Sequence, residues 1–175
     1  TGVVSAANSL VGTTTNDQVG SKVTVLTNGN YVVGSNWNNG AATSVGAVTW
    51  GNGATGISGV VSAANSLVGT TINDGVGFGG VTALTNGNYV VSSYNWNALK
   101  GAVTWGSGVT GIAGAVSTAN SLTGSSNNDQ VGRGGVTALT NGNYVVASPF
   151  WNNGAAIRAG AVTWGNGTTG VTGTV

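Results

Sequence analysis

The chain consists of one unit that occurs three times, and this repetition constrains the fold more than any other feature of the sequence. The segment 4–10 returns unchanged as 61–67 and, with one substitution, as 116–122. Two other segments, 26–33 around Asn-Gly-Asn and 46–51, also occur once in every unit. The sequence therefore predicts a single repeat domain, 1–175, with repeats at about 1–58, 59–113 and 114–175.

Each unit contains four candidate strands. Residues 81–84 and 89–91 flank an Asn-Gly turn, which is typical of an antiparallel hairpin. Residues 101–105 form a third candidate strand, and 114–116 with 121–122 a weaker fourth. We therefore expect an all-β fold made of three tandem four-stranded antiparallel blades of a β-propeller, whose ring is closed by oligomerisation or by further blades. A β-solenoid with three short coils per unit is the alternative.

The residue inventory excludes several classes of function. The chain has no Cys, no His and no Met, only three acidic and four basic residues, and a net charge of +1. The side chains that most often act as general bases or metal ligands are therefore missing, so we expect no enzyme activity, no catalytic residues, no bound metal and no cofactor. So small a positive charge argues against nucleic-acid binding, and no apolar run is long enough for membrane insertion.

The order of motifs in each unit resembles the FG-GAP repeats of integrin-type β-propellers. In the third unit, Val131-Gly132 takes the place of the Phe-Gly pair, Asn141-Gly142-Asn143 takes the place of the loop, and residues 160–164 form the aromatic strand. The resemblance implies propeller blades of the kind found in large bacterial surface and adhesin-like proteins, and hence a location outside the cell or at the cell surface. The loops of that family bind Ca²⁺ through carboxylates, which amides replace here, so we expect no calcium in them.

Three aspartates and six tryptophans recur in register. Asp17, Asp74 and Asp129 occur once per unit and are predicted to accept backbone N–H bonds within a turn. One tryptophan per unit ends the third strand and is expected between blades; these are Trp50, Trp105 and Trp164. The other set follows the second strand in a loop of variable length, with an asparagine beside each ring: Trp37, Trp96 and Trp151 with Asn38, Asn97 and Asn152.

Two hypotheses about function follow. The first is a non-enzymatic, extracellular or surface-displayed repeat module with a structural or adhesive role. The alternative is a carbohydrate-binding lectin with one aromatic subsite per blade, because a ring beside amides is typical of sugar sites. The four basic residues are interpreted as scattered solubilising charges. The expected partners are a second copy of the chain, in a dimer that completes a six-bladed ring, and, for the lectin, glycans.

Overall fold

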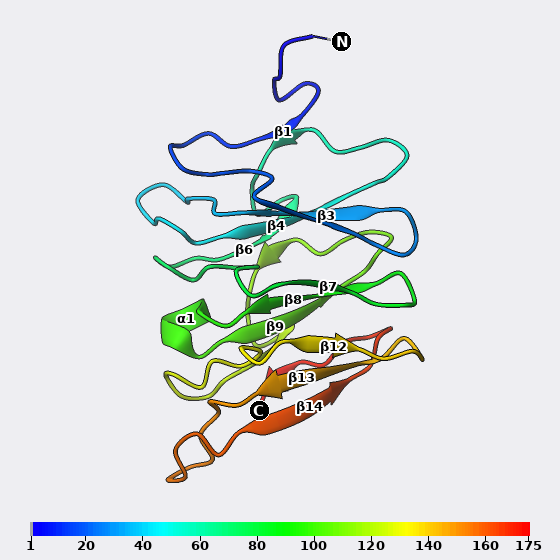
Figure 1. The fold of residues 1–175 in the computed structure, drawn as a ribbon. Helices are drawn as coiled ribbons and strands as arrows, with labels where there is room; N and C mark the ends of the chain where they lie inside the picture. Colours follow the sequence, from blue (N-terminus) through cyan, green and yellow to red (C-terminus); the bar gives the residue numbers. More distant parts are fainter. Residues whose placement is uncertain (1) are drawn as a thin grey trace.

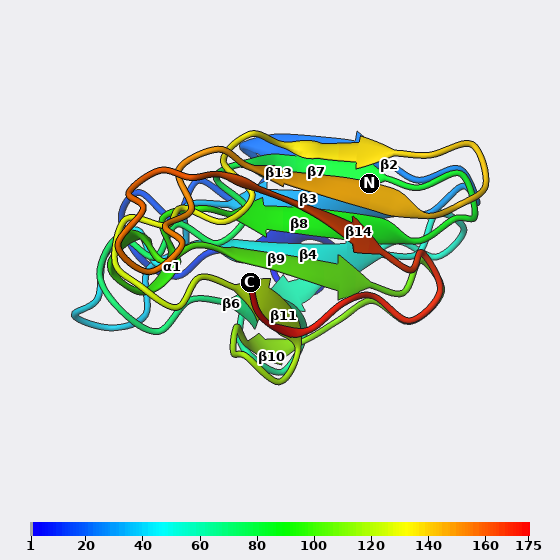
Figure 2. The same cartoon turned by 90° about the horizontal axis from the view of Figure 1, so that it is seen from below.

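The computed structural model describes residues 2–175, and Thr1, with which the first predicted repeat begins, lies outside them. Four β-sheets lie one beneath another in an open column: a two-stranded sheet at the N-terminal end and three larger ones, one for each repeat (Figure 1). Seen along the column, the long strands of successive sheets overlie one another (Figure 2). The described residues are almost entirely strands and turns, so the all-β prediction is confirmed.

A hairpin and a third strand form the centre of each sheet. The hairpins turn at Asn-Gly, where Gly29, Gly87 and Gly142 have φ of 86°, 91° and 88°. These are left-handed conformations that glycine adopts without strain. The hairpin strands are β2 (Lys22–Val25) with β3 (Tyr31–Ser35), β7 (Gly80–Ala83) with β8 (Tyr89–Ser93), and β12 (Val136–Ala138) with β13 (Tyr144–Ser148). The third strands are β4 (Ala47–Gly51), β9 (Ala102–Gly106) and β14 (Ala161–Gly165), and all these pairs are antiparallel, as predicted.

The first two of these sheets have five strands, and their fourth strand comes from the following repeat, whereas the third sheet has three strands. β6 (Ser66–Val68) pairs antiparallel with β4, and β11 (Ser121–Thr123) pairs antiparallel with β9. A fifth, short strand then adds in the parallel direction: β10 (Gly114–Ala115) beside β6, and β15 (Gly173–Thr174) beside β11. At the N-terminal end, β1 (Leu10–Val11) and β5 (Gly59–Val60) form a separate parallel pair.

This arrangement corrects the predicted propeller. The blades were expected to be purely antiparallel and part of a ring, whereas the two five-stranded sheets are mixed and no closed propeller is seen in residues 2–175. The predicted fourth strand is in fact two strands that belong to two different sheets. Because one repeat supplies strands to its own sheet and to the two before it, the units are tied into a column. The parallel pairs between repeats are a solenoid-like feature, but the antiparallel hairpins are not.

The core lies between the sheets. Val48 and Leu67 of the first sheet, both fully buried, pack against Tyr89 of the second in one cluster. The ring of Tyr89 lies over Gly106, its partner across the strands, so closely that a side chain at Gly106 would overlap it. The short turn labelled α1 (Trp96–Leu99) contains left-handed residues, and it closes the second repeat's shorter loop. No helix in the part of the chain that is described is both long and apolar enough to cross a membrane.

Candidate binding site

The three aspartates accept hydrogen bonds that hold their own loops in place. Asp74 is 2% exposed and accepts hydrogen bonds from Thr70 N and Thr71 N at 2.8 Å, from Thr71 Oγ1 at 2.6 Å and from Asn97 N at 3.0 Å. Asn73 before it has a φ of 63°, which asparagine tolerates better than most residues. Asp17 and Asp129 are bonded in the same manner. The predicted turn role is confirmed, since these carboxylates accept hydrogen bonds from backbone N–H groups of the neighbouring loops.

The pKa of Asp17 reflects the same geometry. Burial alone would raise the pKa of this carboxyl group, but the hydrogen bonds from Thr14, Asn38 and Thr13 outweigh it, and the pKa lies below its ordinary value of 3.8. A carboxyl group whose pKa is lowered in the folded state stabilises that state above its unfolded pKa. The contribution of Asp17 to stability is therefore present at neutral pH and is lost as the pH falls through the folded-state pKa.

The first tryptophan set joins neighbouring repeats. Trp50 Nε1 donates to Gly108 O at 3.0 Å, and Trp105 Nε1 donates to Gly167 O at 2.9 Å. The amides of the Asn-Gly-Asn turn reach the same acceptor, since Asn28 Nδ2 and Asn30 Nδ2 each donate to Gly108 O at 2.8 Å. In the first two repeats, the asparagines that stand in place of a calcium loop are thus bonded to the next repeat. Trp50 and Trp105 thus lie between sheets, as expected, whereas Trp164 is exposed.

Removing one of these indole donors should destabilise the column only where an acceptor exists. Trp50→Phe is expected to lower the free energy of unfolding by about 1–2 kcal/mol, because Gly108 O loses a donor in a partly buried site. Trp164 is 55% exposed at the end of the column. Trp164→Phe should therefore change the free energy of unfolding by less than about 0.5 kcal/mol. Urea unfolding of the two variants, each at low protein concentration, measures these free energies. Equal losses would contradict the assigned role of the indole N–H.

The second tryptophan set is not displayed on the surface. Trp37 and Trp96 are each 8% exposed, and Trp151 is half-buried. The asparagines beside them are used within the loops: Asn38 Nδ2 donates to Thr15 O at 2.9 Å, Asn152 Nδ2 to Asp129 Oδ1 at 2.7 Å, and Asn97 N to Asp74. The structure thus places each ring beside its predicted asparagine, but with little open face. The lectin subsites at these residues stay a prediction.

A ladder of cations and aromatic rings runs along one side of the column, and no pattern in the sequence predicted it. Lys22 Nζ lies 5.8 Å from the centre of the Phe78 ring, which meets Tyr94 edge-on at 5.9 Å. Arg133 Cζ lies 5.6 Å from the Tyr94 ring and 4.8 Å from the Phe150 ring. Arg158 completes the ladder, 5.4 Å from Phe150. Three of the four basic residues therefore gather here, which corrects their interpretation as scattered charges.

Charge on this ladder is not balanced by the aspartates, because all three of those are buried in their loops. Lys22, Arg133 and Arg158 are exposed, as is Phe78, at 56%. One signal in the sequence could have located the ladder: Phe78 and Arg133 stand at equivalent places in Gly-x-Gly-Gly segments of successive repeats. Stacked repeats bring equivalent positions to one side, so these two residues had to lie near each other.

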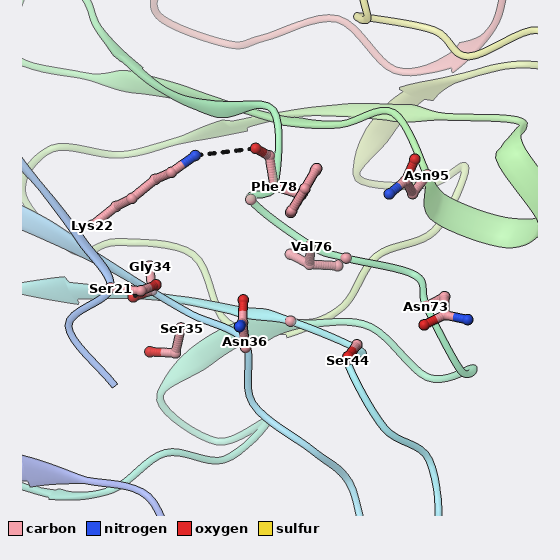
Figure 3. Close-up of a pocket in the computed structure, with 13 residues that line it drawn as sticks. Ser21, Lys22, Gly34, Ser35, Asn36, Ser44, Asn73, Val76, Phe78 and Asn95 are labelled. Atoms are coloured by element: carbon pink, nitrogen blue, oxygen red, sulfur yellow. Dashed lines mark hydrogen bonds between the residues drawn. The ribbon is translucent and has the colours of Figure 1, made fainter. Parts of the chain in front are cut away.

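A pocket of about 350 Å³ opens at the Lys22 end of the ladder, between the first and second repeats (Figure 3). Lys22 reaches across it and donates from Nζ to Phe78 O at 3.2 Å. The amides of Asn36, Asn73 and Asn95 line its other side. The first repeat is one residue shorter than the second at this point and lacks a counterpart of Tyr94. An exposed ring, an ammonium group and several amides thus surround one hollow.

The fold and these contacts define the class of protein: a column of stacked β-repeats joined by donors that recur in every unit. A family model for a repeat of unknown function, DUF5650, matches residues 1–21, 25–78, 83–133 and 138–175. The chain belongs to this family. The match gives no FG-GAP or propeller assignment, so the resemblance to integrin-type repeats is confirmed only as far as tandem repetition. No curated protein and no solved structure matches the chain.

Proposed function

We propose that the chain is a non-enzymatic repeat module with a structural or adhesive role, outside the cell or at its surface. One observation carries the proposal: the polar side chains that recur in every repeat are bonded within their loop or to the next repeat. Asp74 holds its own loop, and Trp50 and Asn30 bond to Gly108. Residues kept for rigidity and stacking suit a spacer or scaffold better than a catalyst.

Two experiments address this proposal. A broad panel of hydrolase and transferase substrates should give no turnover above that of buffer. Reproducible turnover that Lys22→Ala or Asn36→Ala abolishes without unfolding the protein would contradict the proposal. Antibody labelling of intact cells that produce the protein tests the location, since an extracellular module is labelled without permeabilisation and an internal one is not.

Carbohydrate binding is the second candidate, and the pocket at Lys22 and Phe78 favours it. An exposed aromatic face can stack on the apolar face of a sugar ring while amides bond its hydroxyl groups. The cations of the ladder add a preference for acidic sugars. The candidate subsite therefore moves from the buried rings of Trp37 and Trp96 to the ladder, and the ligand class becomes an anionic saccharide.

Binding at the ladder should depend on both the ring and the charge. On a glycan array that includes uronic-acid and sulfated saccharides, the protein is expected to bind acidic members, and Phe78→Ala or Lys22→Ala should weaken this at least tenfold. Lys100→Ala is the matched control, because Lys100 is the basic residue that has no place in the ladder. Binding that is lost with Trp151→Ala but kept with Phe78→Ala would return the subsite to the loop tryptophans.

A further inference from the structure

An asparagine is directly followed by a glycine at seven places in the chain, and the fold does not hold all seven pairs equally. They begin at Asn28, Asn39, Asn52, Asn86, Asn141, Asn153 and Asn166. In such a pair the glycine nitrogen can attack the side-chain amide of the asparagine, since glycine has no Cβ to hinder the approach. This reaction, deamidation, makes asparagine a thermolabile residue. Hydrogen bonds that fix the amide and the glycine nitrogen slow it.

Five of the seven pairs are held at both reacting groups. In the first hairpin turn, Asn28 Oδ1 accepts from Asn30 N at 3.1 Å, and Gly29 N donates to Leu26 O at 3.1 Å. The amide nitrogen of Asn28 also donates to Gly108 O. A bonded Oδ1 and a bonded glycine N–H recur at the pairs that begin with Asn52, Asn86, Asn141 and Asn166. Reaction at these pairs requires the turn to open first.

The other two pairs are held at neither reacting group. Asn39 and Asn153 are exposed and lie at the tips of the long loops of the first and third repeats. Within residues 2–175 their side chains form no hydrogen bond, and Gly40 N and Gly154 N donate none. Only backbone bonds close these turns, such as the one from Asn39 N to Ala42 O at 2.9 Å. The second repeat's shorter loop has no such pair.

The exposure of Asn39 does not depend on where the chain begins or ends. Its loop lies at an internal junction, where the second repeat bonds to it from Asn73 N to Thr43 O at 3.1 Å. Asn39 is exposed with that repeat in place. The loop of Asn153 forms the same turn, on the side of the column that carries α1 (Figure 1). A further repeat packed in the same way would leave Asn153 exposed as well.

We propose that Asn39 and Asn153 are sites of spontaneous deamidation in the folded protein, while the fold protects the five held pairs. The nitrogen of Gly40 attacks Cγ of Asn39 and forms a five-membered succinimide ring. The bond from Cγ to Nδ2 breaks, and the amide leaves as ammonia together with the proton of the Gly40 nitrogen. One water molecule then opens the ring at either carbonyl group, which gives aspartate or isoaspartate. Asn153 and Gly154 react in the same way.

The modification changes the charge of two loops that adjoin the ladder. Each event replaces a neutral amide by a carboxylate, so one event at each position takes the net charge of the chain from +1 to −1. The loop of Asn39 borders the pocket, because Asn36 and Ser44 near its two ends line that pocket. The loop of Asn153 carries Arg158, the last cation of the ladder. Deamidation therefore adds negative charge close to the cations.

Site-resolved mass spectrometry of the unmodified chain tests the proposal. After incubation at mildly alkaline pH and digestion with pepsin at acidic pH, peptides that contain Asn39 or Asn153 should show conversion of amide to acid. The rate should be roughly tenfold or more above that of the five held pairs, because reaction there requires local opening. The control is incubation in urea that unfolds the protein, where all the pairs should react at similar rates.

Three results of this experiment would overturn the proposal. The first is an absence of conversion at Asn39 or Asn153 in the folded protein. The second is conversion at Asn28 as fast as at Asn39. The third is an order of rates that stays the same in urea, since the fold would then not be the cause of the difference.

Isoelectric focusing gives the second readout. The incubated protein should acquire acidic species, and the Asn39→Ser/Asn153→Ser variant should acquire none over the same period. Asn127→Ser is the matched control, since Asn127 is exposed but is not followed by glycine, and this variant should behave as the unmodified chain does. Acidic species that form equally fast in the double variant would overturn the proposal. Neither readout depends on saccharide binding or on location, so its failure is distinct from failure of the proposed function.

Discussion

Replacing Asp74 by alanine is expected to lower the free energy of unfolding by about 3–5 kcal/mol. The carboxylate accepts from three backbone N–H groups and one hydroxyl group, all close to a side chain that is 2% exposed. A buried donor left without an acceptor costs roughly 1–3 kcal/mol, and alanine would leave several at once. Denaturant unfolding followed by tryptophan fluorescence measures the loss.

Two further variants distinguish the effect of losing the carboxylate from the effect of changing a neighbouring residue. Asp74→Asn keeps one acceptor oxygen and should give an intermediate loss. Asn73→Gly, one residue away, preserves the left-handed backbone that Asn73 adopts and should shift the stability by less than about 1 kcal/mol. If Asp74→Ala were no more damaging than Asn73→Gly, the aspartates would not be the structural centres of their loops.

Gly108→Ala should be comparably severe, at about 3–5 kcal/mol. An added Cβ would overlap the carbonyl oxygen of Gly87 and lie 2.9 Å from Asn28 Nδ2. Because the obstacle is backbone, the turn itself must shift, and overpacking of this kind typically costs 1–3 kcal/mol or more. The shift would also disturb Gly108 O, which accepts from Asn28, Asn30 and Trp50 of the preceding repeat.

Gly34→Ala is the matched control for Gly108→Ala. Neither glycine has a positive φ, but a Cβ at Gly34 would meet nothing nearer than Lys22 Cβ, at 3.5 Å. Its effect should stay within about 0.5 kcal/mol, measured in the same denaturant series. A similar loss for both variants would mean that the close approach of Gly108 to Gly87 does not restrict the residue at position 108.

The elements within one repeat could be predicted from the sequence, because they depend on local chemistry. Asn28-Gly29 defines a hairpin turn, and alternation defines the strands on either side of it. The relation between repeats could not be predicted in this way. Nearly regular spacing of motifs suits a propeller or a column. The choice depends on the short parallel pairs such as Gly114 with Leu67, where two residues carry no recognisable strand pattern.

The candidate site, too, could be predicted from the sequence only in part. The lectin alternative needs an open ring at Trp37 and Trp96, but each of these side chains is only 8% exposed. The ladder was missed because the residue type changes from repeat to repeat, even where the position recurs, as at Phe78 and Arg133. Residues that occur once become neighbours only when the stacking of repeats is known, and periodicity analysis disregards such residues.

One cysteine pair tests most directly the central claim that the sheets of the first two repeats are each completed by a strand of the following repeat. Thr104 and Ser121 are both fully buried, directly opposite one another on β9 and β11, with their hydroxyl oxygens 2.7 Å apart. Mild oxidation of the folded Thr104→Cys/Ser121→Cys variant, analysed by mass spectrometry after proteolysis, should give a disulfide within one chain. Two free thiols in the folded, oxidised protein, or disulfides formed only between chains, would contradict the account.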